Sequence, residues 1–302
     1  MTKSSNNANS LLAALTRLGY KARLVPISYL PALQQHFAAR LKTADPLIRR
    51  YLSFLNYQPP KTFPNARSVL VLARAQPLLR VAFRHKGKTL RALVPPTYFD
   101  YHKCEREVRG VLKEHGFSMA RSKLPQKTLA VCSGLAQYGR NNIAYVPGWG
   151  SFVKLFAFWT DVPAGAVRLQ PPRMLGECRA CRACITACPT GAIGSKRFLI
   201  RASRCITWHN ERPPDVPFPK WIKPGWHNCI VGCLRCQGVC PANRGVPGKV
   251  EDRGRFSEQD TAYLLKGSFT GTRAKRMDAR LRRVGLELSV FPRNLRVLVT
   301  GP

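Results

Sequence analysis

Seven of the eleven cysteines of this chain lie in two runs whose spacing suits the binding of iron–sulfur cubanes. The first run has two, two and three residues between successive cysteines and a proline after the last; it consists of Cys178, Cys181, Cys184 and Cys188. Three thiolates this closely spaced can hold three corners of one [4Fe-4S] cluster while the fourth reaches a neighbouring cluster. The first run therefore predicts a second cluster.

The second run supplies ligands for that cluster and consists of Cys233, Cys236 and Cys240, followed by Pro241. Exchange of the last cysteines gives cluster one the thiolates of Cys178, Cys181, Cys184 and Cys240. It gives cluster two the thiolates of Cys188, Cys233, Cys236 and one upstream cysteine, either Cys205 or Cys229. Spacing favours Cys229 by nearness, but its gap to Cys233 is three residues instead of two. A pair of such clusters transfers electrons one at a time.

Two other uses of these cysteines fit the pattern poorly. A zinc site needs two separated pairs or a Cys/His set that closes one tetrahedron, whereas the first run places three cysteines within seven residues. A disulfide framework needs an oxidising compartment. The short apolar stretch at residues 11–15 is too brief for a signal peptide, and no apolar run approaches the length of a bilayer span. We therefore expect a cytoplasmic protein without a membrane segment.

The net charge is the most unusual property of the composition. Fifty Lys and Arg against fifteen Asp and Glu give a formal charge of +35, and two oxidised clusters with their thiolates remove only about four units of it. Such a field favours polyanions, namely tRNA, other nucleic acids, acidic donor proteins or anionic cofactors. A generally basic proteome would raise the charge in the same way, so the charge alone does not name the partner.

The most concentrated basic stretch lies near the C-terminus. Its charged residues alternate with apolar ones at helical spacing; they are Arg273, Lys275, Arg276, Arg280, Arg282 and Arg283. The pattern predicts an amphipathic helix. Its charged side chains fit either a solvated face or a phosphate-binding face.

The segment before the cysteines predicts alternating helices and strands. We expect helices over 9–18, 31–42 and 98–115, and strands over 21–27, 67–73 and 152–159. Residues 80–84 and 89–94 flank a turn in which Gly87 can supply a positive φ, which predicts a hairpin. Further on, Ser257 and Asp260 form a capping box for a helix that ends before Gly267.

The composition of the sequence changes near residue 165, where a pair of prolines precedes the cysteine-rich part. The chain of 302 residues has room for two domains with cores of their own. We expect an α/β domain over residues 1–165. Residues 166–302 are then expected to form a ferredoxin-like α+β domain with two [4Fe-4S] clusters and a short helical C-terminal extension.

Several segments around the cysteines resemble one known family. They are Cys-Pro-Thr-Gly-Ala-Ile at 188–193, Arg-Cys-Ile-Thr at 204–207, the stretch 231–241, the glycine-rich segment 133–142 and Asp100-Tyr101-His102. Together with the expected strand near residue 70, they cover roughly residues 60–245 and resemble the epoxyqueuosine reductase family. The cluster cysteines are the most specific part of the likeness.

The resemblance implies a cobalamin-dependent reductase in which electrons pass through two clusters to a corrinoid and then to an epoxide on a modified tRNA base. It favours Cys205 over Cys229 as the last ligand of cluster two and leaves Cys229 as a spare thiol. It also implies corrinoid contacts from Tyr101, His102, Ser133, Gly134, Arg140, Asn141 and Asn142. Taken singly, each of these upstream residues is equally well explained by a structural role.

The sequence departs from the family in two respects. The family's proton-donating aspartate lies about fifteen residues before the glycine-rich segment, where residues 117–122 of this chain contain no carboxylate. The nearest proton donors in the sequence are Tyr138, Tyr145 and Lys123, and the catalytic residues are therefore not assigned. The C-terminal stretch is also short for the helical repeats with which family members grip tRNA. The resemblance is thus to a shorter sister group whose substrate is unidentified.

Three functions follow from these observations. The leading one is an iron–sulfur oxidoreductase that passes electrons through two [4Fe-4S] clusters to a bound cobalamin. The first alternative is a ferredoxin-like electron-transfer protein without its own corrinoid, and the second is a basic nucleic-acid-binding protein with structural or redox-sensing clusters. The expected partners are a low-potential electron donor of ferredoxin or flavodoxin type and tRNA or another polyanion.

Overall fold

The computed structural model describes residues 3–42, 44–98, 101–165, 169–195, 200–246 and 250–300. The chain divides into two compact units. Unit 1 consists of Met1–Ala75 and Tyr101–Cys181, and unit 2 of Gln76–Asp100 and Arg182–Pro302. The sequence suggests a single boundary near residue 165, whereas the structure assigns the segment 76–100 to unit 2. None of the helices in the described ranges is both long and apolar enough to cross a membrane.

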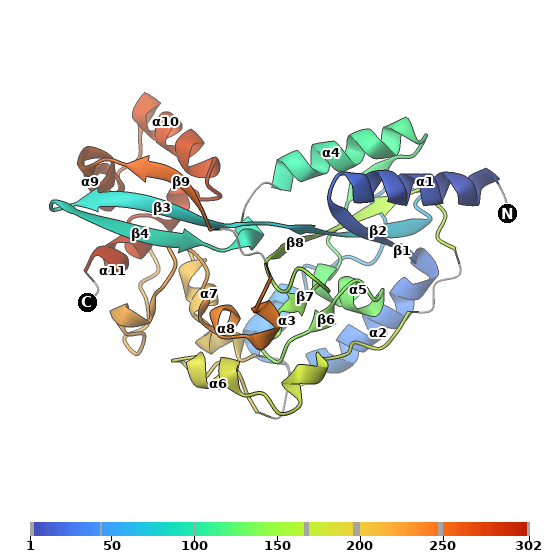
Figure 1. Cartoon of the computed structure of the whole chain (residues 1–302), viewed down its shortest axis with the longest axis horizontal. Helices are drawn as coiled ribbons and strands as arrows, with labels where there is room; N and C mark the ends of the chain where they lie inside the picture. Colours follow the sequence, from blue (N-terminus) through green and yellow to red (C-terminus); the bar gives the residue numbers. More distant parts are fainter. Residues whose placement is uncertain are drawn as a thin grey trace. The chain divides into compact units, whose positions relative to one another are not determined.

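Unit 1 combines helices with a four-stranded antiparallel sheet of order β1-β2-β8-β5 (Figure 1). Its strands are β1 (Tyr20–Pro26), β2 (Ser68–Ala75), β5 (Met119–Arg121) and β8 (Val153–Thr160). A small ladder joins β6 (Gln137–Tyr138) and β7 (Ala144–Tyr145). Its helices are α1 (Lys3–Arg17), α2 (Leu30–Leu41), α3 (Pro46–Leu52), α4 (Tyr101–Glu114) and α5 (Gln126–Cys132).

Helices cover both faces of this sheet. Figure 1 shows α1 and α4 on one side and α2 and α5 on the other. On the first side, Val108 and Leu112 of α4 and Leu11 and Leu15 of α1 pack against the sheet. Their spacing of four residues places each pair on one face of its helix. The central strand β2 is apolar on both faces because both are buried.

Most elements expected for the N-terminal part are confirmed. The expected helices over 9–18, 31–42 and 98–115 correspond to α1, α2 and α4, and the expected strands to β1, β2 and β8. Gly19 follows α1 with φ +82°, a conformation that favours glycine. The short elements α3, β5 and α5 did not follow from the pattern.

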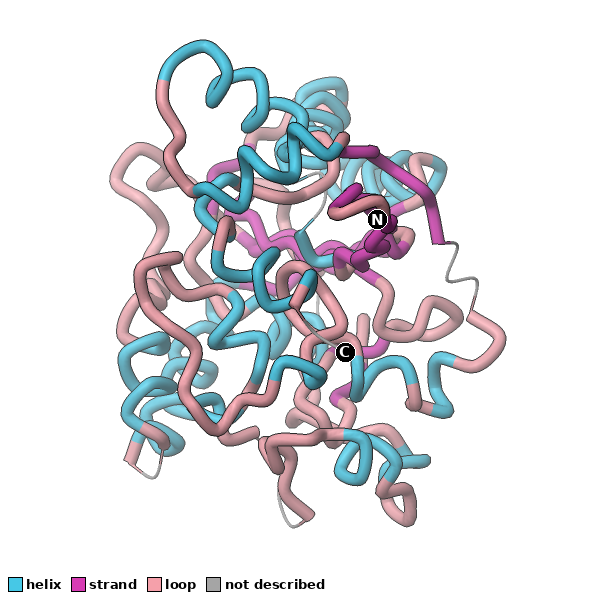
Figure 2. Tube along the Cα trace, turned by 90° about the vertical axis from the view of Figure 1, so that its left-hand side faces the viewer, coloured by secondary structure: helices cyan, strands magenta, loops and turns pink. Residues whose placement is uncertain are grey.

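Unit 2 contains a three-stranded sheet of order β4-β3-β9 and several helices. The strands are β3 (Leu78–His85), β4 (Lys88–Val94) and β9 (Val250–Phe256). The short helices of the cysteine-bearing stretch are α6 (Ala183–Ala187), α7 (Ile206–Asn210) and α8 (Arg235–Gly238). The C-terminal helices are α9 (Glu258–Lys266), α10 (Gly271–Arg282) and α11 (Arg293–Val299). Loops join these pieces, and loops are prominent throughout the chain (Figure 2).

The hairpin of unit 2 confirms the turn read from the sequence. Strands β3 and β4 pair antiparallel, with His85 opposite Lys88. Lys86 and Gly87 between them have φ of +48° and +73°, as a two-residue turn of this kind requires. Strand β9 adds to the other side of β3 in parallel. Because it lies more than 150 residues away in the chain, no local pattern indicates this pairing.

The core of unit 2 lies between one face of this sheet and the C-terminal helices. Leu79, Val81 and Phe83 of β3 are fully buried against residues of α9, α10 and α11. Helix α9 has the expected capping box of Ser257 and Asp260, and Gly267 ends it in the left-handed conformation. Helix α10 is the expected amphipathic basic helix, with Met277 and Leu281 on its buried face.

Candidate iron-sulfur site

The two cysteine motifs have the same backbone conformation. In the first motif, Arg182 has φ −123° and ψ 2°, and in the second the corresponding Leu234 has φ −110° and ψ 1°. In each motif the carbonyl of this residue accepts N–H groups from the residues three and four positions later. The closing Cys188 and Cys240 are both extended and each donates its N–H three residues back. The two motifs are thus structural copies of one turn and one short helix.

The short helices of the two motifs pack against each other. Helix α6 carries Cys184 and helix α8 carries Cys236, and the two helices are in contact. Cys188 and Cys240 follow their helices and precede prolines. Two equivalent half-modules in contact are what an exchange of the last cysteine between two clusters requires.

Three thiols from separate parts of the chain gather in unit 2. Burial raises the pKa of Cys233 to about 11, and the neighbouring thiols of Cys205 and Cys188 contribute to the rise. Burial also raises the pKa of Cys205, and the thiol of Cys188 contributes to that rise. The hydroxyl of Thr190 lies 3.4 Å from the Cys188 sulfur. Since these three cysteines lie 17 and 28 residues apart in the chain, their proximity is a property of the fold.

Cys205 and Cys229 occupy different environments. Cys205 stands immediately before α7, where the N–H groups of Thr207 and Trp208 face its sulfur, although the geometry is looser than that of a standard helix cap. Helix N-termini stabilise negative charge, including thiolates. Cys229 is 1% exposed, its backbone pairs with Leu93, and burial raises the pKa of its thiol well above the usual range. Cys229 also neighbours Cys233, and the N–H of Leu234 faces its sulfur.

The first cysteine of the first motif is held by the glycine-rich segment. The backbone N–H of Arg140 donates to the Cys178 sulfur at 3.4 Å. The guanidinium of Arg140 also donates to the Cys178 carbonyl and, at 3.5 Å, to that of Arg179. Hydrogen bonds to cluster sulfurs orient the ligand and tune the cluster. Arg140 was expected to contact a corrinoid, and the structure gives it a role in positioning Cys178.

The other residues of this segment shape a tight loop. Asn141 is buried and donates to the Tyr145 hydroxyl at 2.9 Å. Asn142 has φ +60°, and its carbonyl accepts from Lys127 at 3.1 Å. Ser133 ends α5 and donates to the Ala130 carbonyl, and Gly134 follows with φ +74°. A corrinoid would therefore meet a segment whose side chains already have partners within the unit.

Tyr101 and His102 lie at the start of α4, on the side of the sheet opposite α5 (Figure 1). The Tyr101 ring packs against Phe156 and Phe158, and the guanidinium of Arg121 lies over it at 5.6 Å. Asp100, the first residue of the expected motif, lies outside the described residues. The two expected groups of corrinoid contacts are thus on opposite faces of the unit 1 sheet.

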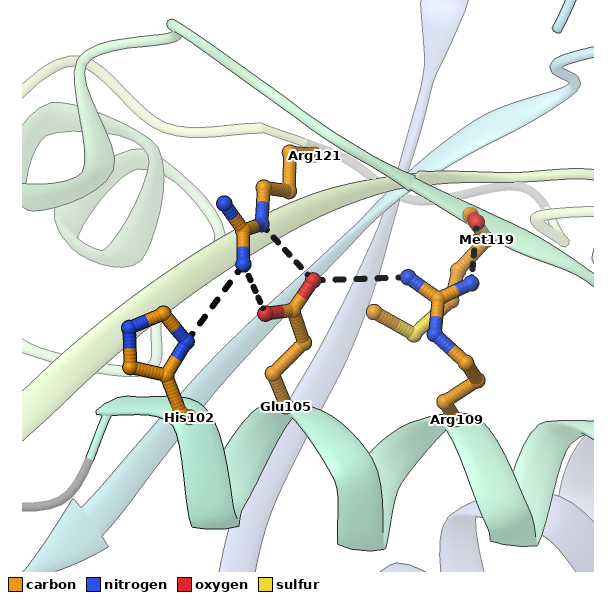
Figure 3. Close-up of polar contacts among 5 residues, drawn as sticks. All are labelled: His102, Glu105, Arg109, Met119 and Arg121. Atoms are coloured by element: carbon orange, nitrogen blue, oxygen red, sulfur yellow. Dashed lines mark hydrogen bonds and ion pairs between the residues drawn. The ribbon is translucent and has the colours of Figure 1, made fainter.

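Residues 117–122 contain no carboxylate, but the fold brings the Glu105 carboxylate of α4 next to Arg121 of this segment (Figure 3). Glu105 of α4 accepts from Arg121 at 2.6 and 2.8 Å and from Arg109 at 3.3 Å. Arg109 also donates to the Met119 carbonyl at 3.0 Å. The hydrogen bonds from Arg121 hold the pKa of the buried Glu105 carboxyl below its usual range. Glu105 is therefore an ionised anchor and a poor proton donor.

A second carboxylate, Asp161, accepts the Ser118 N–H at 2.9 Å at the end of β8. The tyrosines considered as proton donors are both buried and hydrogen-bonded: the Tyr138 hydroxyl lies 2.7 Å from that of Thr128, and the Tyr145 hydroxyl accepts from Asn141. Sequence reasoning missed Glu105 and Asp161, because both lie outside the segment and approach it only through the fold.

The donor set fits iron–sulfur chemistry. The cysteines of the two motifs are all buried or half-buried. In the part of the chain that the structure describes, no three Cys, His, Asp or Glu side chains meet as ligands of a single metal ion. A four-iron cluster is wider than one ion, so its thiolates stand farther apart than the ligands of one metal.

Comparison with known proteins agrees with this donor set. Residues 177–243 match the model of the 4Fe-4S double cluster binding domain. This stretch contains both motifs together with Cys205 and Cys229. It is therefore a domain for two [4Fe-4S] clusters.

The comparison extends beyond the cysteine-bearing stretch. Epoxyqueuosine reductase of Bacillus subtilis is 28% identical over 201 residues, which cover 62% of this chain and 50% of that protein. The chain spans about half the length of the curated relatives it matches.

Solved structures share the fold over nearly the whole chain. A crystal structure of epoxyqueuosine reductase matches with a TM-score of 0.69 and 19% identity, covering 98% of this chain and 82% of that one. A structure of epoxyqueuosine reductase with an epoxyqueuosine-modified tRNA stem loop matches with a TM-score of 0.64 and 19% identity over the same shares. The chain is therefore similar to epoxyqueuosine reductases in sequence over 62% of its length and in fold over nearly all of it, and residues 177–243 match a 4Fe-4S double cluster binding domain.

Proposed function

We propose that this protein is an iron–sulfur reductase that passes electrons through two [4Fe-4S] clusters. In the proposed assignment, cluster one takes Cys178, Cys181, Cys184 and Cys240, and cluster two takes Cys188, Cys205, Cys233 and Cys236. The observation that carries the proposal is the meeting of Cys188, Cys205 and Cys233 in unit 2. The shared backbone conformation of the two motifs supports the proposal. Under this proposal, the cysteine-bearing stretch is a ferredoxin-like α+β module.

Metal analysis tests the proposal. Anaerobically purified protein should carry about eight irons and about eight acid-labile sulfides per chain, because two complete ligand sets are present. On reduction it should give the paramagnetic signals of two interacting clusters. Zinc in place of iron, or half this iron content after full reconstitution, would contradict the proposal.

We extend the proposal to a bound cobalamin, which would supply a reducible cobalt. The resemblance of the segments 101–102 and 133–142 to the family supports this extension. Protein with both clusters should retain cobalamin through gel filtration, with a cobalt(II) signal in paramagnetic resonance. Loss of cobalamin during filtration would reduce the proposal to the two clusters.

A specific observation favours a second candidate, an electron carrier without its own corrinoid. The expected corrinoid contacts lie on two faces of one sheet, and several have structural partners. In this case the protein would hold two clusters, bind no cobalamin and reduce an acceptor protein. The filtration experiment above separates the two candidates.

The substrate of the proposed reductase is a polyanion of the tRNA class. The formal charge of +35 supports this choice, as does the match to a reductase solved with a tRNA stem loop. Affinity for tRNA should fall steeply with salt because counterion release supplies most of the binding free energy. A nucleic-acid-binding protein with purely structural clusters would bind RNA equally well before and after cluster reduction and would reduce no bound base.

The proposed reductase also needs a source of electrons. We propose a low-potential donor of ferredoxin or flavodoxin type. The cytoplasm supplies such donors and keeps thiols reduced, and the proposal therefore places the protein there.

A further inference from the structure

Among the described residues of unit 2, one face of the sheet supplies the core cluster with Leu79, Val81 and Phe83 and the other face supplies no buried core residue. Along β3, Leu79, Val81 and Phe83 are fully buried, so the alternate residues Arg80, Ala82 and Arg84 point to the other face. Arg91 of β4 is exposed and lies opposite Ala82. We call the face formed by Arg80, Arg84, Arg91, Asp252 and Arg255 the arginine face.

A bulge places Arg255 on this face. Arg80 pairs with Asp252 and Ala82 pairs with Arg255, so two residues of β9 stand opposite the single residue Val81. One of them, Gly254, has φ +90°, and a Cβ atom there would lie 3.2 Å from Val284 of the core. Bulges of this type redirect the side chains that follow them. The bulge turns Arg255 outward while Phe256 stacks on Phe83 inside.

The positive charges of the arginine face exceed its negative charge. Arg80 binds Asp252 through two hydrogen bonds of 2.6 Å. The charges of Arg255 and Arg91 also lower the pKa of Asp252, so both guanidinium groups lie nearby. Neither makes an ion pair among the described residues, and Arg84 is likewise exposed without one. Three guanidinium groups thus lie near one carboxylate, and Arg84 lies farther along β3 on the same face.

The arginine face continues into the cluster-binding segment of unit 2. Leu93 of β4 lies opposite Arg80. On its other side, Leu93 forms a bridge with Cys229, and its carbonyl accepts the Ile230 N–H at 3.2 Å. The residues just before Cys233 therefore extend this sheet at its β4 edge. A molecule seated on the arginine face would adjoin the segment that we assign to cluster two.

We propose that the arginine face binds a small acidic one-electron carrier protein, which delivers electrons to cluster two. This inference rests on the proposed function as an iron–sulfur reductase. Charge complementarity selects the partner, because a carrier with a carboxylate-rich surface meets three unneutralised guanidinium groups. One electron leaves the reduced carrier, which is oxidised by one equivalent, and the cluster-bearing chain is reduced by one equivalent. No bond breaks and no proton moves.

The face fits a protein better than a nucleic acid. Asp252 and Arg80 present a paired carboxylate and guanidinium among the other arginines, a mixed charge pattern that a protein surface can match with residues of both signs. None of the five residues that define the face is aromatic, and the neighbouring Phe83 and Phe256 point into the core. Single-stranded nucleic acids usually stack their bases on aromatic side chains.

Charge reversal tests the proposal in the full-length protein. The test variant is Arg84→Glu/Arg91→Glu/Arg255→Glu. The control is Lys275→Glu/Arg276→Glu/Arg283→Glu, which makes the same change of charge at exposed positions on and just after α10 of the same unit. Affinity is measured with an oxidised flavodoxin and, separately, with an oxidised [2Fe-2S] ferredoxin, at low and at high salt. Reduction is followed by stopped flow with the reduced carriers.

The test variant should bind at least one carrier about tenfold more weakly and accept its electrons about tenfold more slowly at low salt. The control should change by about twofold at most, and salt should remove the difference. Dithionite should reduce all variants alike. A failure of dithionite to reduce the wild-type clusters would refute the proposed function, while carrier binding would still test the docking face.

Three results would overturn the proposal. One is absence of carrier binding to the wild type at low salt. Another is an equal loss in the test and control variants, which would show an effect of net charge alone. The third is a test variant that loses affinity for a short RNA stem-loop but not for either carrier, which would make the face a nucleic-acid surface.

Discussion

The two cysteine motifs share a backbone conformation but differ in the source of the outermost cysteine of the ligand sets that we propose. In the first motif, Cys178 lies three residues before Cys181. In the second, the position three residues before Cys233 is Ile230, which is fully buried in the core of unit 2. The thiol of Cys205, just before α7, approaches in its place. The turn and the short helix therefore position the last three cysteines of each motif. The position three residues before them is not fixed by this turn and can hold a core residue instead of a cysteine.

The supports of the two motifs differ as well. Arg140 holds the first motif through the sulfur and carbonyl of Cys178. The second motif depends on helix α11, where Asn294 donates to the carbonyls of Asn210 and Ile230. Asn210 in turn donates to the Gly232 carbonyl at 2.7 Å. The C-terminal extension is thus a structural brace for the second motif.

The largest effect should come from removing cysteines in pairs. Cys178→Ala/Cys188→Ala should lose all the iron, because one residue belongs to each proposed cluster although both lie in the first motif. Cys188→Ala/Cys205→Ala should lose about half, because both belong to cluster two. Iron analysis after anaerobic reconstitution measures both. Equal iron contents in the two variants would refute the exchange of ligands between motifs.

A smaller effect is expected at Gly232, whose counterpart in the first motif is Ala180. Its φ is +69°, and a Cβ atom would lie 2.9 Å from the Tyr98 hydroxyl and 3.1 Å from Pro95. Gly232→Ala should therefore cost about 1–3 kcal/mol and lower the melting temperature. The matched control is Gly238→Ala in α8, where nothing lies within 4 Å. If the control is destabilised as much as Gly232→Ala, the steric argument fails.

Loss of the brace from α11 should have a comparable or smaller effect. Asn294→Ala leaves two buried carbonyls without this donor, which costs about 1–2 kcal/mol. The second cluster should be released first on heating, seen as loss of half of the iron absorbance at a lower temperature than in the wild type. Arg296→Ala on the same helix removes only an exposed hydrogen bond and should melt like the wild type. Simultaneous release of both clusters in Asn294→Ala would argue against a local brace.

The smallest effect should come from Glu105, which belongs to unit 1. Its pKa is lowered in the folded state, so its contribution is present above the unfolded pKa of about 4.3 and is lost as the pH falls through the folded value. Glu105→Gln should cost about 1 kcal/mol at pH 7, because its arginine partners are half exposed. Denaturant unfolding should show the two proteins converging below pH 4. If the difference in unfolding free energy between the two proteins grew as the pH fell, the pKa of Glu105 would be raised in the folded state and not lowered.

Local patterns predicted much of this fold. The hairpin followed from Gly87, and helix α9 from Ser257, Asp260 and Gly267, because each signal acts on its immediate neighbours. The pairing of Arg80 with Asp252 joins residues 172 positions apart, and the bulge that turns Arg255 outward forms where β9 pairs with the distant strand β3. No periodicity in the sequence reports such contacts.

The candidate site was predictable to a similar degree. Cysteine spacing predicted seven of the eight proposed cluster ligands, since the turn that holds them is local. The choice between Cys205 and Cys229 depends on where α7 and β4 lie in space, and only the resemblance favoured Cys205. The role of Arg140 at Cys178 likewise joins residues 38 positions apart and could not be read from the glycine-rich segment.

The iron content of two single variants tests the central claim most directly. Cys205→Ala should lose about half of the iron and sulfide after anaerobic reconstitution, and its reduced form should show the signal of one isolated cluster. Cys229→Ala should keep about eight irons and the signal of two interacting clusters. The reverse pattern, full iron in Cys205→Ala and half in Cys229→Ala, would contradict the account and assign the last ligand of cluster two to Cys229.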